Sequence, residues 1–508
     1  MTSLRTYIAW RIKAKTQTFG SIKCNIKEPL ISNQKQQTNE AHRMVSIQSR
    51  YTVFPSETTP NETLFSLCEQ IKLRTHAPLL YVFKPHPHHD ASSFVNILRH
   101  ALSKALTIYY PVAGRLSWIQ GGRWELHCNA KGAQILEAIC KDVTLDDLGD
   151  FVPTHLVSQL IPNIDYDVPI EDTPLLVAQL TRFPCGGVTI GVALCRGAID
   201  GIATMRFMNT WAKLARGENV EKAPCHDRNV LNSYKGNSGL HDHSEFHPPP
   251  PWLGPLEKDT KVAVATVKLT GEQVKKLKHK GNLANTGPSS QQRYSTFEVV
   301  SGHLWRCVSK ARYAGKREQP TRLTTLVNCR HRMKPPLPED YAGNTAFPTV
   351  TPTCSFGEIM QRPLSYAVGN VRVALERVTG EFVESALDHI DREKDMNLIR
   401  YNFHYPAPSV HKGAYKGNPN LFVVSWMNFS FKDADFGWGE PLYFGPGFMD
   451  SEGKAFLLNE ANGDGIIVAI SLEASHMDAF KKFFYADIEQ ESLISKLWRV
   501  WLFFKHSG

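Results

Sequence analysis

Residues 194–201 of this chain read LCRGAIDG and residues 435–439 read DFGWG, and these two stretches decide the fold. The first one follows residues 188–194 (VTIGVAL), a short, apolar, β-branched run that predicts a buried strand. Alternation along a strand places Cys195 and Arg196 on opposite faces. We therefore expect Cys195 to be a core thiol, with a catalytic nucleophile as the alternative.

The strands and the helix predicted elsewhere in the N-terminal part of the chain indicate a layered α/β fold. Residues 79–83 (LLYVF) have the character of another buried strand, and a first strand is expected from Met44 to Val53. Residues 93–106 carry apolar side chains at helical spacing. Strands mixed with helices indicate an α/β architecture.

The length of 508 residues exceeds the usual range of one domain, so we expect two. Residues 221–259 are rich in Pro, His, Asn and Gly, which predicts a crossover linker. The expected domains span 44–220 and 260–485. Residues 1–43 are expected to be a disordered extension and residues 486–508 a tail.

The amino-acid composition limits which binding partners and which cellular compartment we expect. The formal net charge is +9, of which residues 1–43 contribute +6, so the body is close to neutral and no nucleic-acid partner is expected. Ten cysteines without Cys-x-x-Cys pairing are typical of a reduced, cytoplasmic protein. No run reaches the roughly 18 apolar residues of a membrane span. We expect a monomer that acts on a small molecule.

Two histidine clusters raise the question of a metal site. One occupies residues 86–90 (HPHHD), and the other consists of His241, His243 and His247. Neither has the spacing of a zinc site, so we expect solvated loop residues and no metal. The chain also lacks a Gly-rich phosphate loop and a G-x-G-x-x-G after a strand, so no nicotinamide or flavin cofactor is expected.

Six motifs resemble, in order, those of the plant BAHD acyltransferases, which use coenzyme A thioesters to acylate alcohols and amines. They lie at residues 110–116, 200–201, 295–306, 335–344, 425–426 and 435–439. The resemblance covers residues 44–485. It implies a two-domain, chloramphenicol-acetyltransferase-like α/β fold with a channel between the domains, and acyl-CoA as co-substrate.

The resemblance also implies roles for single residues. Ser425 and the indole N–H of Trp426 would stabilise the oxyanion of the reaction. Asp200 would position its loop through an arginine, and Asp435 would form an interdomain ion pair with Arg330. The structural motif would consist of Asp200, Gly201, Asp435, Gly437, Trp438, Gly439 and Arg330.

A segment near residue 270 is the candidate for coenzyme binding. Residues 270–273 (TGEQ) form a capping box that begins a helix with several lysines. A helix N-terminus beside lysines suits phosphate, and the family uses this segment for it. The candidate contacts are Lys268, Thr270 and Lys275; the alternative is a solvated basic helix.

One position departs from the family pattern. The signature is His-x-x-x-Asp-Gly, and Arg196 stands where the histidine, the general base, is expected. The pKa of arginine is above 12, so Arg196 cannot accept a proton at neutral pH. Losing such a base typically costs about 10²- to 10⁴-fold in rate.

Three hypotheses follow from Arg196. Acyl transfer can persist with an amine acceptor, an alkaloid or polyamine, while Arg196 stabilises the oxyanion or a coenzyme phosphate. Alternatively, Arg196 is a fixed cation for conjugate addition, cyclisation, cycloaddition or dimerisation without coenzyme A. The third hypothesis is a non-catalytic, metabolite-binding relative. Asn428 and Lys432, which replace a usual arginine and a usual aromatic residue, argue against a shikimate- or quinate-like carboxylate acceptor near residue 428.

Overall fold

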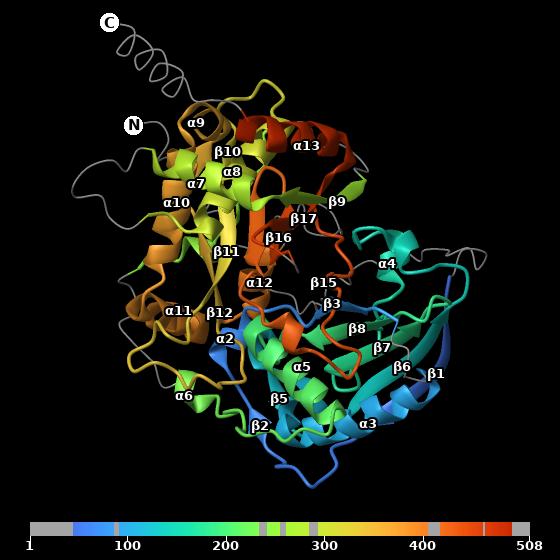
Figure 1. The fold of residues 1–508 in the computed structure, drawn as a ribbon. Helices are drawn as coiled ribbons and strands as arrows, with labels where there is room; N and C mark the ends of the chain where they lie inside the picture. Colours follow the sequence, from blue (N-terminus) through green and yellow to red (C-terminus); the bar gives the residue numbers. More distant parts are fainter. Residues whose placement is uncertain are drawn as a thin grey trace, which may run out of the picture. The chain divides into compact units, whose positions relative to one another are not determined.

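Two six-stranded sheets organise the chain in the computed structural model (Figure 1). The segments 1–43, 86–90 and 490–508 lie outside the described residues, and with them one histidine cluster and most of the expected tail. The structure describes residues 44–85, 91–232, 241–254, 261–283, 293–404, 417–460 and 463–489.

The first sheet is built mainly from the N-terminal part of the chain. Its β6 and β7 are parallel, and every other neighbouring pair is antiparallel. Its last strand, β15, comes from far along the chain and pairs with β3. The strand order is β1 (Val45–Val53), β6 (Ala133–Cys140), β7 (Leu176–Arg182), β8 (Val188–Cys195), β3 (His76–Phe83) and β15 (Tyr443–Pro446).

Two helices, α3 (Ala91–Ile108) and α5 (Gly201–Ala215), cover one face of this sheet (Figure 1). Phe94, Leu98 and Leu102 recur at helical spacing on α3 and are at most 2% exposed. The indole of Trp211 on α5 donates a hydrogen bond to the carbonyl of Leu98 (3.0 Å). The two helices and the sheet therefore share one core.

The second sheet comes from the C-terminal part, and helices cover its outer face (Figure 1). Its β11, β14 and β16 are parallel neighbours. The strand order is β12 (Ala346–Val350), β11 (Leu323–Asn328), β14 (Leu421–Ser425), β16 (Lys454–Asn459), β17 (Ile466–Glu473) and β9 (Val262–Leu269). The covering helices are α7 (Gly271–Asn282), α8 (Thr296–Arg312), α10 (Leu364–Arg377) and α13 (Ala474–Glu489).

Shorter elements complete the described fold. The remaining strands are β2 (Thr63–Leu64), β4 (Arg115–Ile119), β5 (Arg123–His127), β10 (Pro320–Thr321) and β13 (Cys354–Ser355). The remaining α-helices are α2 (Leu67–Gln70), α4 (His155–Ser158), α6 (Asn229–Asn232), α9 (Phe356–Gln361), α11 (Gly380–Arg392) and α12 (Met396–His404). The 3-10 helices are η2 (Tyr110–Ala113), η3 (Gln120–Gly122), η4 (Asp146–Leu148), η5 (Ser244–Phe246) and η6 (Phe431–Asp433).

The α/β fold class is confirmed, together with the strands expected at 44–53, 79–83 and 188–194 and the helix at 93–106. The domain boundaries stay a prediction. Helix α13 runs to Glu489, into the segment expected as a tail. The linker, expected to hold no helix, contains the one-turn helix α6 and the 3-10 helix η5. Helix α6 is held in place because Leu231 is buried and Asn232 bonds to the backbone of Phe65.

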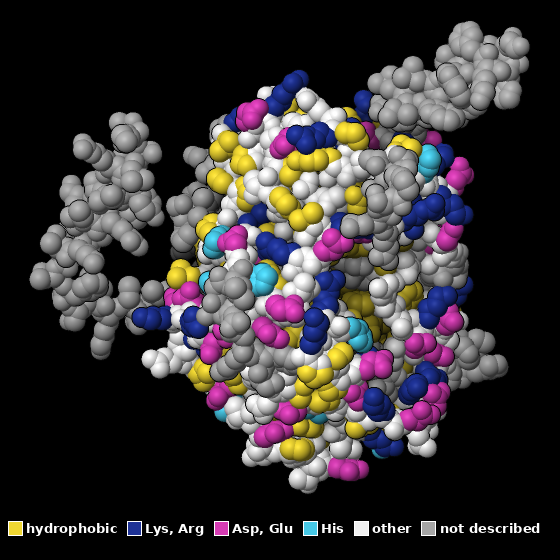
Figure 2. Space-filling view, turned by 90° about the vertical axis from the view of Figure 1, so that its left-hand side faces the viewer, with side chains coloured by type: hydrophobic (Ala, Val, Ile, Leu, Met, Phe, Trp, Pro, Cys, Tyr) yellow, Lys and Arg dark blue, Asp and Glu magenta, His cyan; other side chains and the backbone are white. Residues whose placement is uncertain are grey.

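The surface carries charges of both signs. Figure 2 shows Lys and Arg side chains interspersed with Asp and Glu over one face. Among the described residues no helix combines the length and the apolar character that crossing a membrane requires. In the linker, His243 is buried rather than solvated as expected: its ring nitrogens contact Glu245 (2.8 Å) and the hydroxyl of Ser385 (3.0 Å).

Candidate active site

Arg196 lies directly after β8, and its hydrogen bonds tie this strand end to the start of β3. Its guanidinium donates to the carbonyl of His76 (2.6 Å) and to the hydroxyl of Thr75 (3.2 Å). Its amide donates to the carbonyl of Thr75 (3.0 Å), and its own carbonyl accepts from the side chain of Asn344 (2.9 Å). Position 196 therefore holds a cation that is anchored to the backbone.

Cys195 is buried in the core. The thiol is 1% exposed and lies in a cluster with Leu116 and Trp124. Burial raises the pKa of Cys195 to about 11, so the nucleophilic thiolate is disfavoured at neutral pH. The prediction of a core thiol is confirmed.

His76 is an imidazole beside Arg196 that the sequence did not single out. Its Nδ1 bonds to the hydroxyl of Tyr166 (2.9 Å) and its Nε2 to the carbonyl of Pro174 (2.8 Å). Burial, assisted by the charges of Arg196 and Arg74, lowers the pKa of His76 to about 4. Since both ring nitrogens are occupied, His76 cannot replace the missing general base.

Asp200 caps α5 and forms a buried ion pair with Arg330. Its Oδ1 accepts from the amide of Ala203 (2.9 Å), and its Oδ2 lies 2.7 Å from Nη1 of Arg330. The amide of Thr345 donates to the same Oδ2 (2.9 Å). Both members of the pair are buried, with side chains 3% and 1% exposed. Asp200 therefore joins the start of α5 to the C-terminal part of the chain.

Burial alone would raise the pKa of Asp200. The charge of Arg330 and the hydrogen bonds from Arg330, Ala203 and Thr345 outweigh burial, and the pKa lies below its usual value. The carboxylate is thus charged at neutral pH. Because all its close partners are donors that hold it in place, it acts on the structure of the loop rather than as an acid.

The predicted ion pair between Asp435 and Arg330 is wrong. Arg330 pairs with Asp200, and its remaining N–H groups donate to the carbonyls of Tyr341 (2.9 Å) and Gly343 (3.0 Å) and to the hydroxyl of Thr345 (2.7 Å). These acceptors, together with Asp200, take up the N–H groups of the Arg330 guanidinium.

Asp435 instead stabilises its own turn. Its Oδ1 accepts from the amides of Gly437 (2.7 Å) and Gly439 (2.8 Å), and its carbonyl accepts from Arg216. Gly437 and Gly439 have φ values of 107° and 86°, which favour glycine. The turn directs Trp438 onto Phe94, with ring centroids 3.7 Å apart. The motif therefore docks onto the core of the first sheet.

We expect Asp435→Ala to lower the free energy of unfolding by about 1.5–3 kcal/mol, the range for hydrogen bonds to a charged group. Asp435→Asn keeps one acceptor oxygen and should lose less. Urea unfolding measures both. A loss for Asp435→Ala as large as that for a buried ion pair would reinstate a charged partner for this residue.

Gly201 is required by packing. A Cβ at this position would lie 2.5 Å from Cζ of Phe429, which follows the Ser425-Trp426 pair in the second half of the chain. Since real Cβ contacts are longer, any side chain here would displace that ring. The Asp-Gly sequence thus combines a helix cap with close approach of a distant loop.

Strand β14 ends at Ser425, and Trp426 follows it directly. The Trp426 ring packs against Phe429 (5.8 Å), Phe444 (5.3 Å) and Phe456 (4.7 Å between centroids). Within the described residues its indole N–H makes no hydrogen bond, so it is available to a ligand. The Ser425 hydroxyl accepts from the amide of Met427 at 3.4 Å. Their role at an oxyanion stays a prediction.

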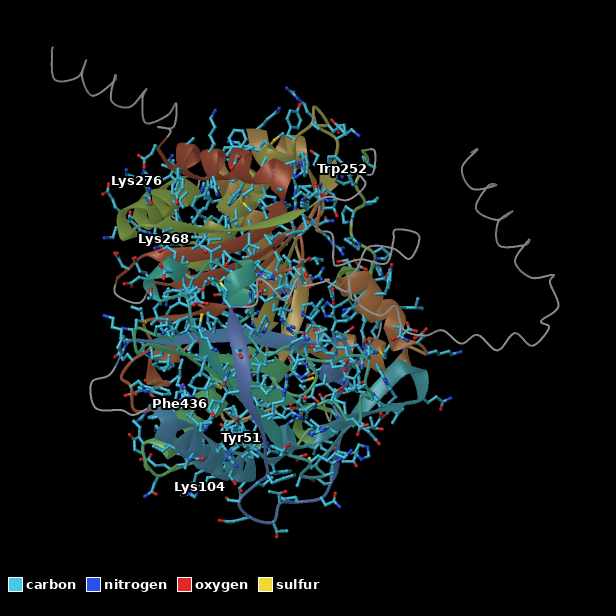
Figure 3. The ribbon with its side chains drawn as sticks, turned by 90° about the vertical axis from the view of Figure 1, so that its right-hand side faces the viewer. Tyr51, Lys104, Trp252, Lys268, Lys276 and Phe436 are labelled. Carbon is cyan, nitrogen blue, oxygen red and sulfur yellow. The ribbon has the colours of Figure 1, made fainter. Side chains whose placement is uncertain are left out.

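The coenzyme segment has the predicted capping box. Thr270 accepts from the amide of Gln273 (3.2 Å), and the side chain of Gln273 accepts from the amide of Thr270 (3.0 Å). Lys268 and Lys275 contact Asp150 (2.6 Å) and Asp464 (3.8 Å). Figure 3 shows Lys268 on β9 and the neighbouring Lys276 on α7 at one side of the molecule. These ion pairs are exposed, so an anionic ligand can compete for the lysines.

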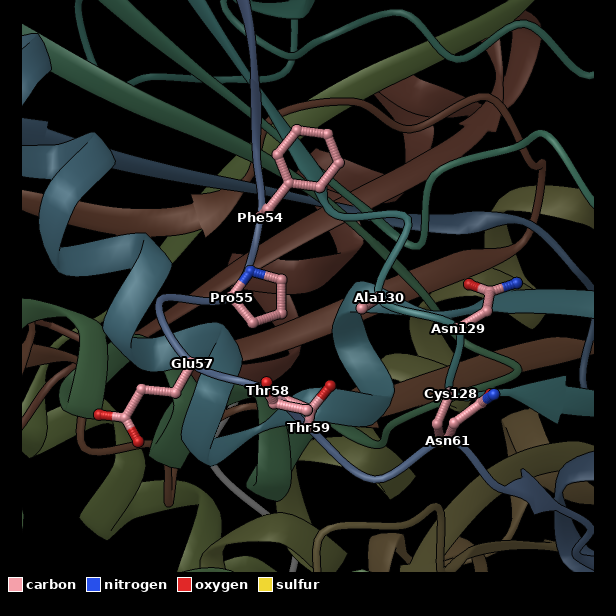
Figure 4. A pocket seen from close by; sticks show the side chains of 9 residues that line it. All are labelled: Phe54, Pro55, Glu57, Thr58, Thr59, Asn61, Cys128, Asn129 and Ala130. Carbon is pink, nitrogen blue, oxygen red and sulfur yellow. The ribbon is translucent and has the colours of Figure 1, made fainter.

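Two cavities of the structure are not lined by Lys268, Thr270 or Lys275. A surface pocket of about 330 Å³ lies between the end of β1 and the loop after β5 (Figure 4). A second space of about 10 Å³ lies next to Cys195 and His76, and is too small for a substrate. None of the candidate site residues lines the larger pocket, so this pocket does not mark a substrate site at the motif residues. The expected channel stays a prediction.

Metal ligands do not gather in the part of the chain that the structure describes: no group of three or more His, Cys, Asp or Glu side chains is placed to hold an ion. Asn428 is exposed, and Lys432 contacts Glu440 at 3.3 Å. Neither residue bonds to the Arg196 or Asp200 networks.

The two α/β halves are joined by the buried Asp200–Arg330 pair and by β15, which the C-terminal part of the chain contributes to the first sheet. Residues 43–487 match the model of the Transferase family. The chain belongs to this family, the BAHD acyltransferases of plants. It is an enzyme that transfers acyl groups. The family match therefore argues against the hypothesis of a non-catalytic relative.

Relatives extend over nearly the same range. Hydroxycinnamoyl-CoA:piscidic acid hydroxycinnamoyltransferase of Actaea racemosa is 40% identical, over 88% of this chain and 100% of that protein. Hydroxycinnamoyl-CoA:5-hydroxyanthranilate N-hydroxycinnamoyltransferase of Avena sativa is 36% identical, over 87% and 99%. The crystal structure of vinorine synthase is 22% identical over 86% of this chain and 96% of its own, with a TM-score of 0.64, and shows the shared fold.

Proposed function

We propose that this enzyme transfers an aromatic acyl group from acyl-CoA to an amine. The observation that carries the proposal is Arg196, a cation bound to the carbonyl of His76 where the family has its base. A neutral amine attacks with its own lone pair, whereas an alcohol needs its proton removed in the transition state. Transfer to an amine should therefore be impaired less than transfer to an alcohol by the arginine at position 196.

The relatives support the donor and the acceptor class. Both relatives are named for hydroxycinnamoyl-CoA as the donor, and the enzyme of Avena sativa is named for transfer to the nitrogen of 5-hydroxyanthranilate. We extend the acceptor class to the amines of alkaloids and polyamines, which also attack through a nitrogen lone pair once they are neutral. Exposed Asn428, in the position of a usual arginine, supports an acceptor without a shikimate- or quinate-like carboxylate there.

In the proposed reaction the amine nitrogen attacks the thioester carbonyl, and the indole N–H of Trp426 stabilises the oxyanion, with Ser425 beside it. Lys268, Thr270 and Lys275 would hold coenzyme phosphates at the start of α7. Arg196 adds a fixed positive charge that favours the anionic intermediate. The products are an amide and free coenzyme A.

Product mass tests the proposal directly. Purified enzyme is incubated with a set of amines, including 5-hydroxyanthranilate and spermidine, with and without hydroxycinnamoyl-CoA. We expect masses increased by one acyl group, only when the thioester is present. A rearranged or dimerised product formed without thioester would instead establish the repurposed chemistry considered above.

Binding of the coenzyme has a separate expected result. Acyl-CoA at 100 times its dissociation constant should stabilise the folded enzyme by about 2.7 kcal/mol, seen as a higher melting temperature. Changing Lys268 and Lys275 together to Met should reduce this shift, whereas Lys104→Met on α3 should not. Stabilisation by an alkaloid alone, with none by millimolar acyl-CoA, would contradict the proposal.

A further inference from the structure

Lys454 is a lysine that no motif singles out, at the start of β16. It pairs with Phe422 of β14 and with Ser471 of β17. Residues two apart on a strand share a face. Phe456 and Leu458 on this face pack into the core of the first sheet, while Ala455 and Leu457 face the outer helices. Lys454 is therefore on the face of the second sheet that turns toward the first sheet.

The ammonium of Lys454 lies beside the aromatic group around Trp426. Its Nζ is 5.2 Å from the ring centroid of Phe456 and 5.6 Å from that of Phe422. The Phe456 ring in turn lies 4.7 Å from that of Trp426. One aromatic ring thus separates Lys454 from the proposed oxyanion donor.

Lys454 has no anionic partner within the described residues, where its Nζ makes neither a hydrogen bond nor an ion pair. The side chain of Lys454 is half-buried rather than sealed in the core. The charged groups that act on it are Arg196, at the end of β8, and Asp450, before β16. On β14 there is no titratable side chain, and Glu473 on β17 contacts His476.

These surroundings disfavour the charged form. Burial, followed by the charge of Arg196, lowers the pKa of Lys454 to about 7, although Asp450 opposes the shift. About half of the Lys454 side chains are then neutral amines at pH 7. A neutral amine with an open lone pair can accept a proton, which Arg196 and His76 cannot do.

We propose that Lys454 is the general base of this enzyme, in place of the histidine that Arg196 replaces. The inference rests on the proposed acyl transfer. The acceptor nitrogen forms its bond to the thioester carbon, the carbonyl electrons move to the oxygen, and the nitrogen proton passes to Nζ of Lys454. The oxyanion then re-forms the carbonyl, the carbon–sulfur bond breaks, and the thiolate takes the proton from Lys454. Lysine is regenerated as a neutral amine.

The test is Lys454→Met and Lys454→Arg in the full-length enzyme, with Lys104→Met on α3 as the matched control. The probes are hydroxycinnamoyl-CoA and 5-hydroxyanthranilate, whose aromatic amine is uncharged over the pH range used. We expect kcat to fall by at least about tenfold in both Lys454 variants, with a smaller change in KM, because the amine needs a base only to lose its proton after the attack. Lys104→Met should behave as the unmodified enzyme.

The pH profile separates a base from a merely structural lysine. In the unmodified enzyme kcat should rise as the pH increases through about 7, because the neutral amine is the active form. This rise should disappear in Lys454→Arg. Removing the neighbouring charge with Arg196→Gln should raise the pKa of Lys454 and move the rise to higher pH.

The outcomes are distinguishable. Unchanged kcat and an unchanged pH profile in Lys454→Arg would overturn the role of Lys454 and leave the acyl transfer standing. If Lys454→Met does not fold, Lys454→Arg, which keeps the charge and the length, decides alone. Absence of transfer by the unmodified enzyme to every amine tested would overturn the proposed function, and this inference with it.

Discussion

Replacing Arg196 with histidine should increase acyl transfer to an alcohol acceptor by at least about tenfold and by up to about 10⁴-fold. Imidazole titrates near neutrality and can accept the hydroxyl proton, whereas guanidinium cannot. Asp200 and its hydrogen bonds remain in place to hold the loop. Transfer to an amine should change much less. The measurement is kcat/KM for hydroxycinnamoyl-CoA with a matched pair of alcohol and amine acceptors.

Arg196→Lys is the control for charge. It keeps the cation but loses the two contacts to Thr75 and His76, so it should not gain alcohol transfer. If Arg196 serves a repurposed reaction, Arg196→His should abolish that reaction instead. Equal turnover of the alcohol by all three proteins would mean that position 196 is remote from the chemistry.

Asp200→Ala should lower the free energy of unfolding by about 3–5 kcal/mol, because it leaves the buried charge of Arg330 without its partner. The variant also removes the cap of α5 and the acceptor of the Thr345 amide. We expect lower soluble yield and a lower melting temperature. Urea unfolding monitored by tryptophan fluorescence measures the loss.

The matched control is the exposed pair of Lys131 and Asp172, whose side chains are 47% and 62% exposed. Asp172→Ala should change the stability by at most about 1 kcal/mol. Because the pKa of Asp200 is lowered in the fold, its contribution is present above about pH 4 and declines as the pH falls toward the folded pKa. An Asp200→Ala protein with full stability but no activity would place Asp200 at the chemistry.

The strands, the helices and the family were accessible from the sequence, because the signals that carry them are local. The β-branched run at 188–194, the helical spacing at 93–106 and the capping box at Thr270 each involve neighbours within a few residues. The loss of the base at Arg196 also needed no structure, since the pKa of arginine excludes it. These features depend on chain geometry and residue chemistry alone.

The partners of the charged residues were decided by the tertiary structure. Arg330 lies 130 positions from Asp200, and nothing in the local pattern ranks Asp200 above Asp435 as its partner. Lys454 is an ordinary strand residue in the sequence; only its burial in the fold, followed by the approach of Arg196, lowers its pKa. Burial and electrostatic shifts depend on which distant segments meet, because desolvation and Coulomb interactions act through space rather than along the chain.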